Sequence, residues 1–349
     1  MIGNCRGFHS IPIIDVQKLR DSGSTLDERK RVGFELDRAC REVGFFYVRN
    51  HGICDDLTTR VREMSRRWFD LPADVKAQIA LTADCKQKGF RGYQALGSNV
   101  TRYDGGFQRD WHEAIDLYKH FDESHPAVMA GLPLHGPNPW PTQIDGHREA
   151  LETYVQECIS LGADLLRGIA LGLQLDEDFF GGSNAGDPFW VMRIIHYPPL
   201  ELSAAPSGSE STFAALMGEE VERSVQLSCG EHTDYGLLTI VNQDENVSAL
   251  QVKNSAGKWV AADPIPGTFV CNIGDMFKVW TNGLYQPTMH RVINISSAKR
   301  RISVPFFYEP NFNTRVEPLS QLCGSEPPRY PGITYGDHLQ SKVFQNFEI

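Results

Sequence analysis

The sequence predicts an α+β protein with a mainly β core, in which helices and strands alternate early and short strands dominate later. After residue 187, runs rich in β-branched and aromatic residues follow one another, and turn residues such as Pro266-Gly267 and Asn282-Gly283 separate them. Regular short strands of this kind are typical of a sandwich, a barrel or a jelly roll. Before residue 187, strand-like runs alternate with segments whose apolar residues recur at helical spacing.

The first part of the chain, residues 1–125, is expected to form an N-terminal α/β extension. Residues 11–16 and 43–53 combine β-branched and aromatic side chains and are predicted strands, the second ending in a turn at Asn50-His51-Gly52. Residues 27–40 and 55–68 have the spacing of amphipathic helices. Residues 82–145 are rich in Gly, Pro and polar side chains, which predicts long ordered loops with short elements.

Residues 126–186 are expected to be a connecting helical segment, with the clearest helix over residues 149–173. Residues 187–312 are the predicted β core, 313–349 a C-terminal tail, and all four regions one structural unit. An insert at 203–220 is expected to be a mobile or partly helical excursion. The core strands are predicted within residues 189–197, 236–243, 249–254, 258–263, 268–274, 290–294 and 301–309.

Composition limits the classes of partner. The chain has 349 residues and a formal net charge of −10, which argues against binding to nucleic acid or to an anionic membrane surface. No apolar run is long enough to span a bilayer. Eight cysteines are scattered without a CxxC pair and no signal-peptide pattern is present, so reduced thiols and a cytoplasmic location are expected. Nothing in the sequence demands an interface, and we expect a soluble monomer.

A histidine and an aspartate stand two residues apart in CGEHTDYGLLTI, residues 229–240. If this run is one strand, His232 and Asp234 share a face and can hold one divalent ion such as Fe(II), Mn(II) or Zn(II). Taken alone, the pair is better read as a hydrogen-bonded couple. His290, at the start of another strand-like run, changes this, because two His and one Asp compose the facial triad of non-haem Fe(II) oxygenases.

Two further polar residues alternate at the start of the next predicted strand. Arg301 and Ser303 are expected to share one face of RISVPFF. A guanidinium fork and a hydroxyl can together hold the distal carboxylate of a dicarboxylic cosubstrate.

The order HTD, then HRV, then RIS resembles the H-x-D…H…R-x-S signature of the 2-oxoglutarate and Fe(II)-dependent dioxygenases. The subgroup that it resembles includes isopenicillin N synthase and the plant gibberellin, flavonoid and alkaloid oxygenases. IPIIDV and VGFFYVRNHGI also resemble that subgroup's opening motifs, so the likeness covers nearly the whole chain. The resemblance implies a double-stranded β-helix, or jelly roll, with flanking helices.

The resemblance also implies roles for individual residues. His232, Asp234 and His290 would bind iron, and Arg301 and Ser303 would bind the C5 carboxylate of 2-oxoglutarate. Tyr197 matches the tyrosine of the family's N-x-Y-Y-P stretch beside the cosubstrate. Ile195 and His196 depart from that stretch, which puts an asparagine contribution in doubt.

The implied activity is the oxidation of a small molecule, by hydroxylation, desaturation or a related C–H oxidation, with release of succinate and CO₂. Fe(II), 2-oxoglutarate and O₂ are required, with ascorbate as a supporting reductant. Three alternatives stay open. They are fragmentation of 2-oxoglutarate as in the ethylene-forming enzyme, a metal-binding jelly-roll sensor without turnover, and a zinc hydrolase, which would leave Arg301 and Ser303 without a role.

The organic substrate cannot be identified from the sequence, but candidate contacts can be named. Arg193 lies among apolar residues of a predicted core strand, where it needs either a substrate carboxylate or an internal salt bridge. His112, in DWHEAIDL, is interpreted as a helix-start residue near the pocket; a zinc-protease motif is excluded because position 116 is Asp. The candidate substrate residues are Arg193, Tyr93, Phe107, His112 and Phe307.

Overall fold

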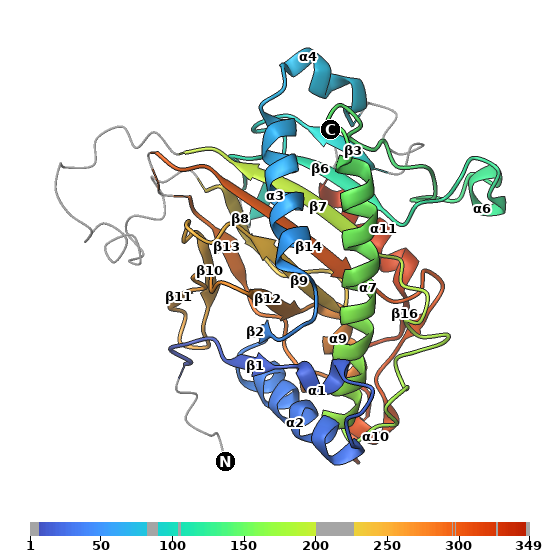
Figure 1. Cartoon of the computed structure of the whole chain (residues 1–349). Helices are drawn as coiled ribbons and strands as arrows, with labels where there is room; N and C mark the ends of the chain where they lie inside the picture. Colours follow the sequence, from blue (N-terminus) through green and yellow to red (C-terminus); the bar gives the residue numbers. More distant parts are fainter. Residues whose placement is uncertain are drawn as a thin grey trace.

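The computed structural model describes residues 7–81, 90–103, 106–199, 227–294, 296, 298–325 and 327–346. Two β-sheets form the core, and long helices cover the outer face of the larger one (Figure 1). This is the predicted α+β architecture with a jelly-roll core. Most of the predicted insert at 203–220 and its surroundings, residues 200–226, lies outside the described residues.

The large sheet has eight strands, which are antiparallel except for the parallel pair formed by its first two. In spatial order they are β1 (Ile13–Asp15), β2 (Phe45–Arg49), β12 (Thr268–Ile273), β9 (Leu238–Gln243), β14 (Arg301–Tyr308), β7 (Val191–Tyr197), β6 (Glu113–Tyr118) and β3 (Gly92–Gln94). The first two strands come from the N-terminal region, so that region contributes directly to the sheet of the core.

The small sheet is antiparallel and has four strands, β11 (Trp259–Ala261), β10 (Leu250–Lys253), β13 (His290–Val292) and β8 (Cys229–His232). Two-stranded sheets form from β4 (Val100–Tyr103) with β5 (Gly106–Arg109) and from β15 (Arg315–Val316) with β16 (Ile333–Thr334). The short helices are α1 (Gln17–Arg20), α4 (Ala73–Lys76), η1 (Ala77–Ile79), α6 (Pro126–Met129), α9 (Asp275–Trp280) and α10 (Ser320–Cys323).

The long helices begin and pack for identifiable reasons. Helix α2 (Leu26–Glu42) starts with a capping box, in which the Thr25 hydroxyl accepts from the Glu28 amide and the Glu28 carboxylate accepts from the Thr25 amide. It lies against α7 (His147–Gly172), where a Cβ added to Gly33 would stand 2.6 Å from the Gly168 carbonyl oxygen. Glycine at 33 therefore permits the close contact between the two helices.

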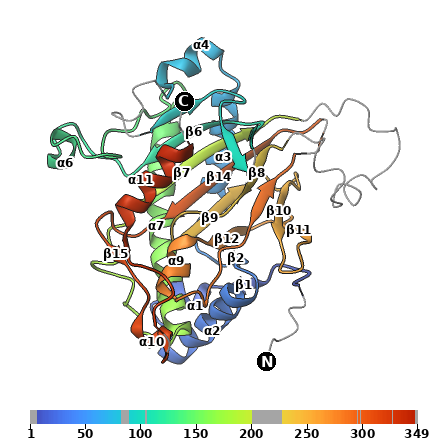
Figure 2. The ribbon, with the colours of Figure 1, turned by 180° about the vertical axis from the view of Figure 1, so that it is seen from behind.

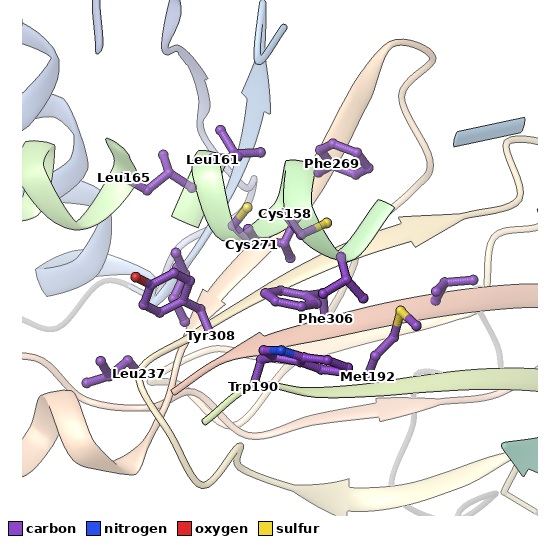
Figure 3. Packing of buried hydrophobic residues seen from close by; sticks show 14 of the residues in the cluster. Cys158, Leu161, Leu165, Trp190, Met192, Leu237, Phe269, Cys271, Phe306 and Tyr308 are labelled. Atoms are coloured by element: carbon purple, nitrogen blue, oxygen red, sulfur yellow. The ribbon is translucent and has the colours of Figure 1, made fainter. Parts of the chain in front are cut away.

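Side chains that alternate along each strand point either into the apolar core or into the space between the two sheets. On β14, Ile302, Val304, Phe306 and Tyr308 join the apolar core under α7, whereas Arg301, Ser303 and Phe307 face the space between the sheets. Figure 3 shows Phe306 beside Cys158 of α7, with Tyr308 on the same side of that helix. The face of the large sheet that points at the small sheet is thereby left for polar residues.

Helix α11 (Tyr335–Asn346) comes from the C-terminal region and lies on the opposite side of the molecule from α7, as the rear view shows (Figure 2). Helix α3 (Asp55–Phe69) lies beside α7 on the front (Figure 1). Within the described residues, no helix combines the length and the apolar character needed to cross a membrane.

Most predicted elements are confirmed, including the helices at 27–40, 55–68 and 149–173, and the core strands. Two predictions are wrong. DWHEAIDL leads into strand β6 rather than into a helix. The run at 229–240 is two strands, because β8 ends at His232 in the small sheet and β9 begins at Leu238 in the large one.

Candidate metal centre

Three side chains meet between the two sheets. His232 ends β8, His290 begins β13, and the two residues are paired in the antiparallel register of the small sheet. Asp234 lies in the chain that crosses from β8 to β9, and its Oδ1 atom is 3.7 Å from Nε2 of each histidine. One ligand atom from each residue lies within 4.8 Å of the others. The separation suits three ligands of a single ion.

The orientation of both imidazoles is fixed by the backbone. His232 Nδ1 lies 2.8 Å from the Gly230 carbonyl oxygen, and His290 Nδ1 lies 3.1 Å from that of Thr288. A carbonyl can only accept, so each Nδ1 donates its proton. Each Nε2 then has a lone pair available for an ion placed between the three side chains. This is the usual outer support of metal-bound histidine.

The two oxygen atoms of the Asp234 carboxylate have different surroundings. Its Oδ2 atom accepts hydrogen bonds from Thr239 Oγ1 at 2.5 Å and from Asn272 Nδ2 at 2.6 Å. Those two residues come from β9 and β12 of the large sheet. Oδ1 is left facing the histidines, and His232, Asp234 and His290 together have the ligand composition of the Fe(II) facial triad.

Asp234 shares the site for a different reason than the one predicted. Strand alternation does not align it with His232, because β8 has already ended at that histidine. The hydrogen bonds to Oδ2 and the crossing between the sheets orient the carboxylate instead. The predicted grouping of His232, Asp234 and His290 is nevertheless confirmed.

Two cavities meet at this triad. The larger, of about 250 Å³, extends toward β4, β6 and α11, and the smaller, of about 70 Å³, extends between the sheets toward Arg301 and Ser303. His232 and Asp234 line both. An ion bound there would therefore be accessible from two separate spaces, as an enzyme with a cosubstrate and a substrate requires.

Arg301 is almost completely buried, with 1% of its surface exposed, at the end of the smaller cavity. Its Nη2 atom donates to Gln243 Oε1 at 2.6 Å, whereas Nε and Nη1 are buried without a hydrogen-bond partner among the described residues. Unsatisfied buried donors are costly, and an anion would satisfy them. Ser303 lies on the same face of β14 and lines the same cavity.

Tyr197 and His112 lie beside Arg301. Tyr197 is opposite Arg301 in the register of β7 and β14, and the guanidinium carbon lies 5.1 Å from the centre of the tyrosine ring. The His112 ring meets Tyr197 edge-on at 5.5 Å, and its Nδ1 donates to the Ser228 carbonyl at 2.7 Å. Burial lowers the pKa of His112 to about 3, with Arg193 adding to the effect. His112 lines neither cavity and contacts the tyrosine ring instead.

Arg193 lines both cavities and also has the internal salt bridge that was the alternative to a ligand. Its Nε atom lies 2.6 Å from Asp116 Oδ1, and its Nη2 donates to Asn99 at 3.2 Å. Asp116 and Arg193 are opposite each other in the register of β6 and β7. The carboxylate therefore holds the guanidinium in place beside the triad.

The remaining candidates divide. Phe307 lines both cavities. Tyr93 is buried in the apolar core, where its hydroxyl donates to Glu113 Oε2 at 2.5 Å, and Phe107 is 63% exposed on β5. Neither Tyr93 nor Phe107 lines either cavity.

The larger cavity is acidic, a feature that the sequence did not reveal. Five carboxylate residues line it against one arginine among the described residues, and the five are Asp110, Asp116, Glu231, Asp234 and Glu309. Asp110 and Glu309 have no ion-pair partner in the described part of the chain. Burial raises the pKa of Asp110, and it raises that of Glu309 to about 8. The distances in sequence between these residues gave no signal that they meet.

Comparison with known proteins agrees with this geometry. Residues 11–143 match the family model described as "non-haem dioxygenase in morphine synthesis N-terminal", and residues 191–310 match that of the 2OG-Fe(II) oxygenase superfamily. The chain is 44% identical to a homoarginine-6-hydroxylase of Oryza sativa subsp. japonica, over 97% of this chain and 98% of the relative. It is 43% identical to one of Arabidopsis thaliana, over 98% and 99%.

Solved structures give the same result. A full-length Neurospora crassa protein in complex with alpha-KG and thymine superposes with a TM-score of 0.77 at 25% identity, over 97% of both chains. JOX2 in complex with 2OG, Fe and JA superposes with a TM-score of 0.71 at 27% identity, over 96% of this chain and 84% of JOX2.

Proposed function

The chain belongs to the 2OG-Fe(II) oxygenase superfamily, and from this premise we propose that it hydroxylates a small cationic amino acid of the homoarginine kind. The reaction class follows from the family: an Fe(II)- and 2-oxoglutarate-dependent dioxygenase acting on a small molecule. His232, Asp234 and His290 are its iron ligands. Iron, once bound with 2-oxoglutarate and O₂, supplies the oxidising power, and the protein supplies position and shelter from water.

The acidic cavity beside the triad carries the proposal for a cationic substrate. Asp116 is compensated by Arg193, and Glu231 has Lys253 at 3.3 Å and Arg291 at 3.8 Å. Asp110 and Glu309 have no such cation within the described residues. Burying a carboxyl group without a cation disfavours its charged form, which is why the pKa values of both residues are raised. A cationic ligand would favour the charged form again, and the homoarginine hydroxylases among the relatives act on an amino acid that carries a guanidinium.

We assign the smaller cavity to 2-oxoglutarate. The two unpartnered nitrogen atoms of Arg301 support this assignment, because buried donors without a partner are costly and a carboxylate would accept hydrogen bonds from them. Ser303 would donate to the same carboxylate, and Tyr197 would form the wall beside it. On the substrate side, Arg193 and Phe307 would contact the amino acid.

We further propose that the enzyme acts as a monomer in the cytoplasm and that its regions form one unit. The N-terminal strands β1 and β2 share a sheet with β9 and β12, which support Asp234, and this favours a single unit. Ascorbate would serve as the reductant that keeps iron in its Fe(II) state.

The proposal is tested with the purified protein, Fe(II), 2-oxoglutarate, ascorbate and air. Homoarginine, arginine and lysine are supplied separately, and succinate and amino-acid masses are measured. We expect homoarginine to give succinate and a product heavier by one oxygen atom, and Asp234→Ala to give neither. Succinate formation unchanged by every cationic amino acid would reject the proposed substrate class. Headspace ethylene in place of a hydroxylated amino acid would instead favour fragmentation of 2-oxoglutarate.

A further inference from the structure

Glu309 stands out among the carboxylates of the larger cavity. It follows the end of β14, lines the cavity, and is 3% exposed. Its Oε2 atom has no hydrogen-bond partner of acceptable geometry among the described residues, although the Tyr335 hydroxyl and the Leu237 backbone lie near enough to lower its pKa. No described cation lies within ion-pair distance of this carboxyl group, so a positively charged group that enters the cavity would find a partner here.

The other acidic residues of the cavity already have partners. Asp110 accepts from Thr101 Oγ1 with both oxygens, at 3.0 Å each, and from the Gly230 amide at 2.9 Å. Asp116 pairs with Arg193, and Glu231 has two cations nearby. Glu309 is thus the carboxylate with a free hydrogen-bonding position.

The backbone next to the triad makes room for this carboxylate. A Cβ added to Gly236 would stand 1.3 Å from Glu309 Oε2 and 2.0 Å from the carboxyl carbon. Gly236 follows Asp234 by two residues, so the Glu309 carboxylate is held against the same loop that carries an iron ligand. The Glu309 carboxyl group therefore forms the part of the cavity wall that lies next to the iron ligands.

We propose that Glu309 binds the positively charged side-chain group of the substrate and so determines the preference for cationic amino acids. This inference rests on the proposed function and assigns its specificity to one residue. A guanidinium offers a planar fork of donors that matches a carboxylate. The same cavity contains Arg193, which would receive the carboxylate at the other end of the amino acid. Opposite charges at the two ends of the substrate then meet complementary residues.

The test compares homoarginine with homocitrulline, in which a neutral urea of the same shape replaces the guanidinium. Their dissociation constants are measured by calorimetry on the full chain with Fe(II) and 2-oxoglutarate in the absence of oxygen. The variants are Glu309→Gln, which removes the ionisable carboxyl group, and Glu309→Asp, which keeps it on a shorter side chain. Glu317→Gln is the control, since that glutamate is 65% exposed and lies outside the cavity. The visible band of the iron–2-oxoglutarate complex reports an intact site in each variant.

The wild type and Glu317→Gln are expected to bind homoarginine about 10- to 150-fold more tightly than homocitrulline, the range expected for hydrogen bonds between charged groups. Glu309→Gln should lose most of this preference, and Glu309→Asp should retain part of it. A wild-type preference retained in Glu309→Gln, or no preference in the wild type, would overturn the role of Glu309 but leave the hydroxylation intact. If Glu309→Gln does not fold, full preference in Glu309→Asp overturns the assignment and a reduced one supports it. A wild type that neither binds nor oxidises homoarginine would overturn the proposed function as well.

Discussion

Each iron ligand has one atom fixed by the protein and one directed at the ion. The histidines use Nδ1 for backbone carbonyls, and Asp234 uses Oδ2 for Thr239 and Asn272. These partners determine which atom of each ligand is presented to the metal. Their loss should therefore weaken metal binding even though none of them touches the ion.

Thr239→Val tests this directly, because it removes the hydroxyl that donates to Asp234 while keeping the shape of the side chain. We expect Fe(II) affinity to fall about 10- to 100-fold, the usual effect of losing an outer partner of a metal ligand. Anaerobic Fe(II) titration gives the affinity. Thr239→Ser keeps the hydroxyl and should remain close to the wild type. Equal affinity in the valine and serine variants would show that the hydrogen bond does not orient the ligand.

Arg301→Lys tests the assignment of the smaller cavity. A lysine keeps the positive charge but lacks the planar fork, so the KM for 2-oxoglutarate should rise about 10-fold or more. The neighbouring Arg300→Lys is the matched control, since Arg300 pairs with Asp70 at 2.8 Å and does not line the cavity. A KM for 2-oxoglutarate that responds equally to both changes would contradict the assignment.

At the scale of single residues, the sequence could predict the metal ligands. It could not predict the residues that orient those ligands or line the cavity beside them. His232, Asp234 and His290 could be grouped because their types and order are restrictive. Glu309 and Asn272 could not, since nothing in their local sequence reveals that they meet Asp234 or its cavity. Their proximity depends on which strands become neighbours, and that is a property of the whole sheet.

Strand β14 is the element that joins core and site. One face packs on α7 through residues such as Phe306 and Tyr308 (Figure 3), and the other carries Arg301, Ser303 and Phe307. Because side chains alternate along a strand, a shift of one residue would exchange the two sets. Good packing under α7 therefore also fixes the register of the residues assigned to the cosubstrate.

Gly162→Ala tests that packing. In an isolated helix this change would stabilise by up to about 1 kcal/mol. Here the added Cβ would stand 2.2 Å from Tyr308 Cδ2, so we expect the free energy of unfolding to fall instead, by about 1–3 kcal/mol. Urea unfolding measures the change. Thr153→Ala, on the exposed side of α7, should change stability by less than about 0.5 kcal/mol. A Gly162→Ala variant more stable than the wild type would show that α7 and β14 are not closely packed at this position.

The type of an element was predictable where apolar residues recur at helical spacing over several turns, as in α2, α3 and α7. It was not predictable in DWHEAIDL, because every residue of β6 is buried and the apolar–polar alternation of a half-exposed strand is absent. The run at 229–240 also reads as a single strand, and its division depends on the crossing between sheets at Asp234.

On the scale of the whole molecule, the metal site connects the two sheets. The histidines belong to the small sheet, and Asp234 is held by Thr239 and Asn272 of the large one. A bound ion would therefore link the halves of the jelly roll and favour the folded state, which has the complete site.

Metal addition should consequently stabilise the protein. At free Fe(II) of about 100 times its Kd, the folded state should gain about 2.7 kcal/mol, seen as a rise in Tm under anaerobic conditions. Asp234→Ala should show almost none of this rise. An equal rise in that variant would place the stabilising ion elsewhere on the chain.

The jelly-roll class and the reaction class were both predictable, since four separated motifs in order define them across nearly the whole chain. The substrate class that we propose was not. It rests on the acidic cavity, whose lining comes from β4, β6, α11 and the end of β14, segments that are far apart in the sequence. Only folding brings their charges together.

The most direct test of the enzyme's central chemistry uses homoarginine and 2-oxoglutarate under ¹⁸O₂, with mass spectrometry of both products. A dioxygenase at this triad should give succinate carrying one ¹⁸O atom and an amino acid heavier by one oxygen, in equal amounts, and Asp234→Ala should give neither. Unlabelled succinate, or labelled succinate whose amount does not depend on homoarginine, would contradict a coupled hydroxylation of this substrate.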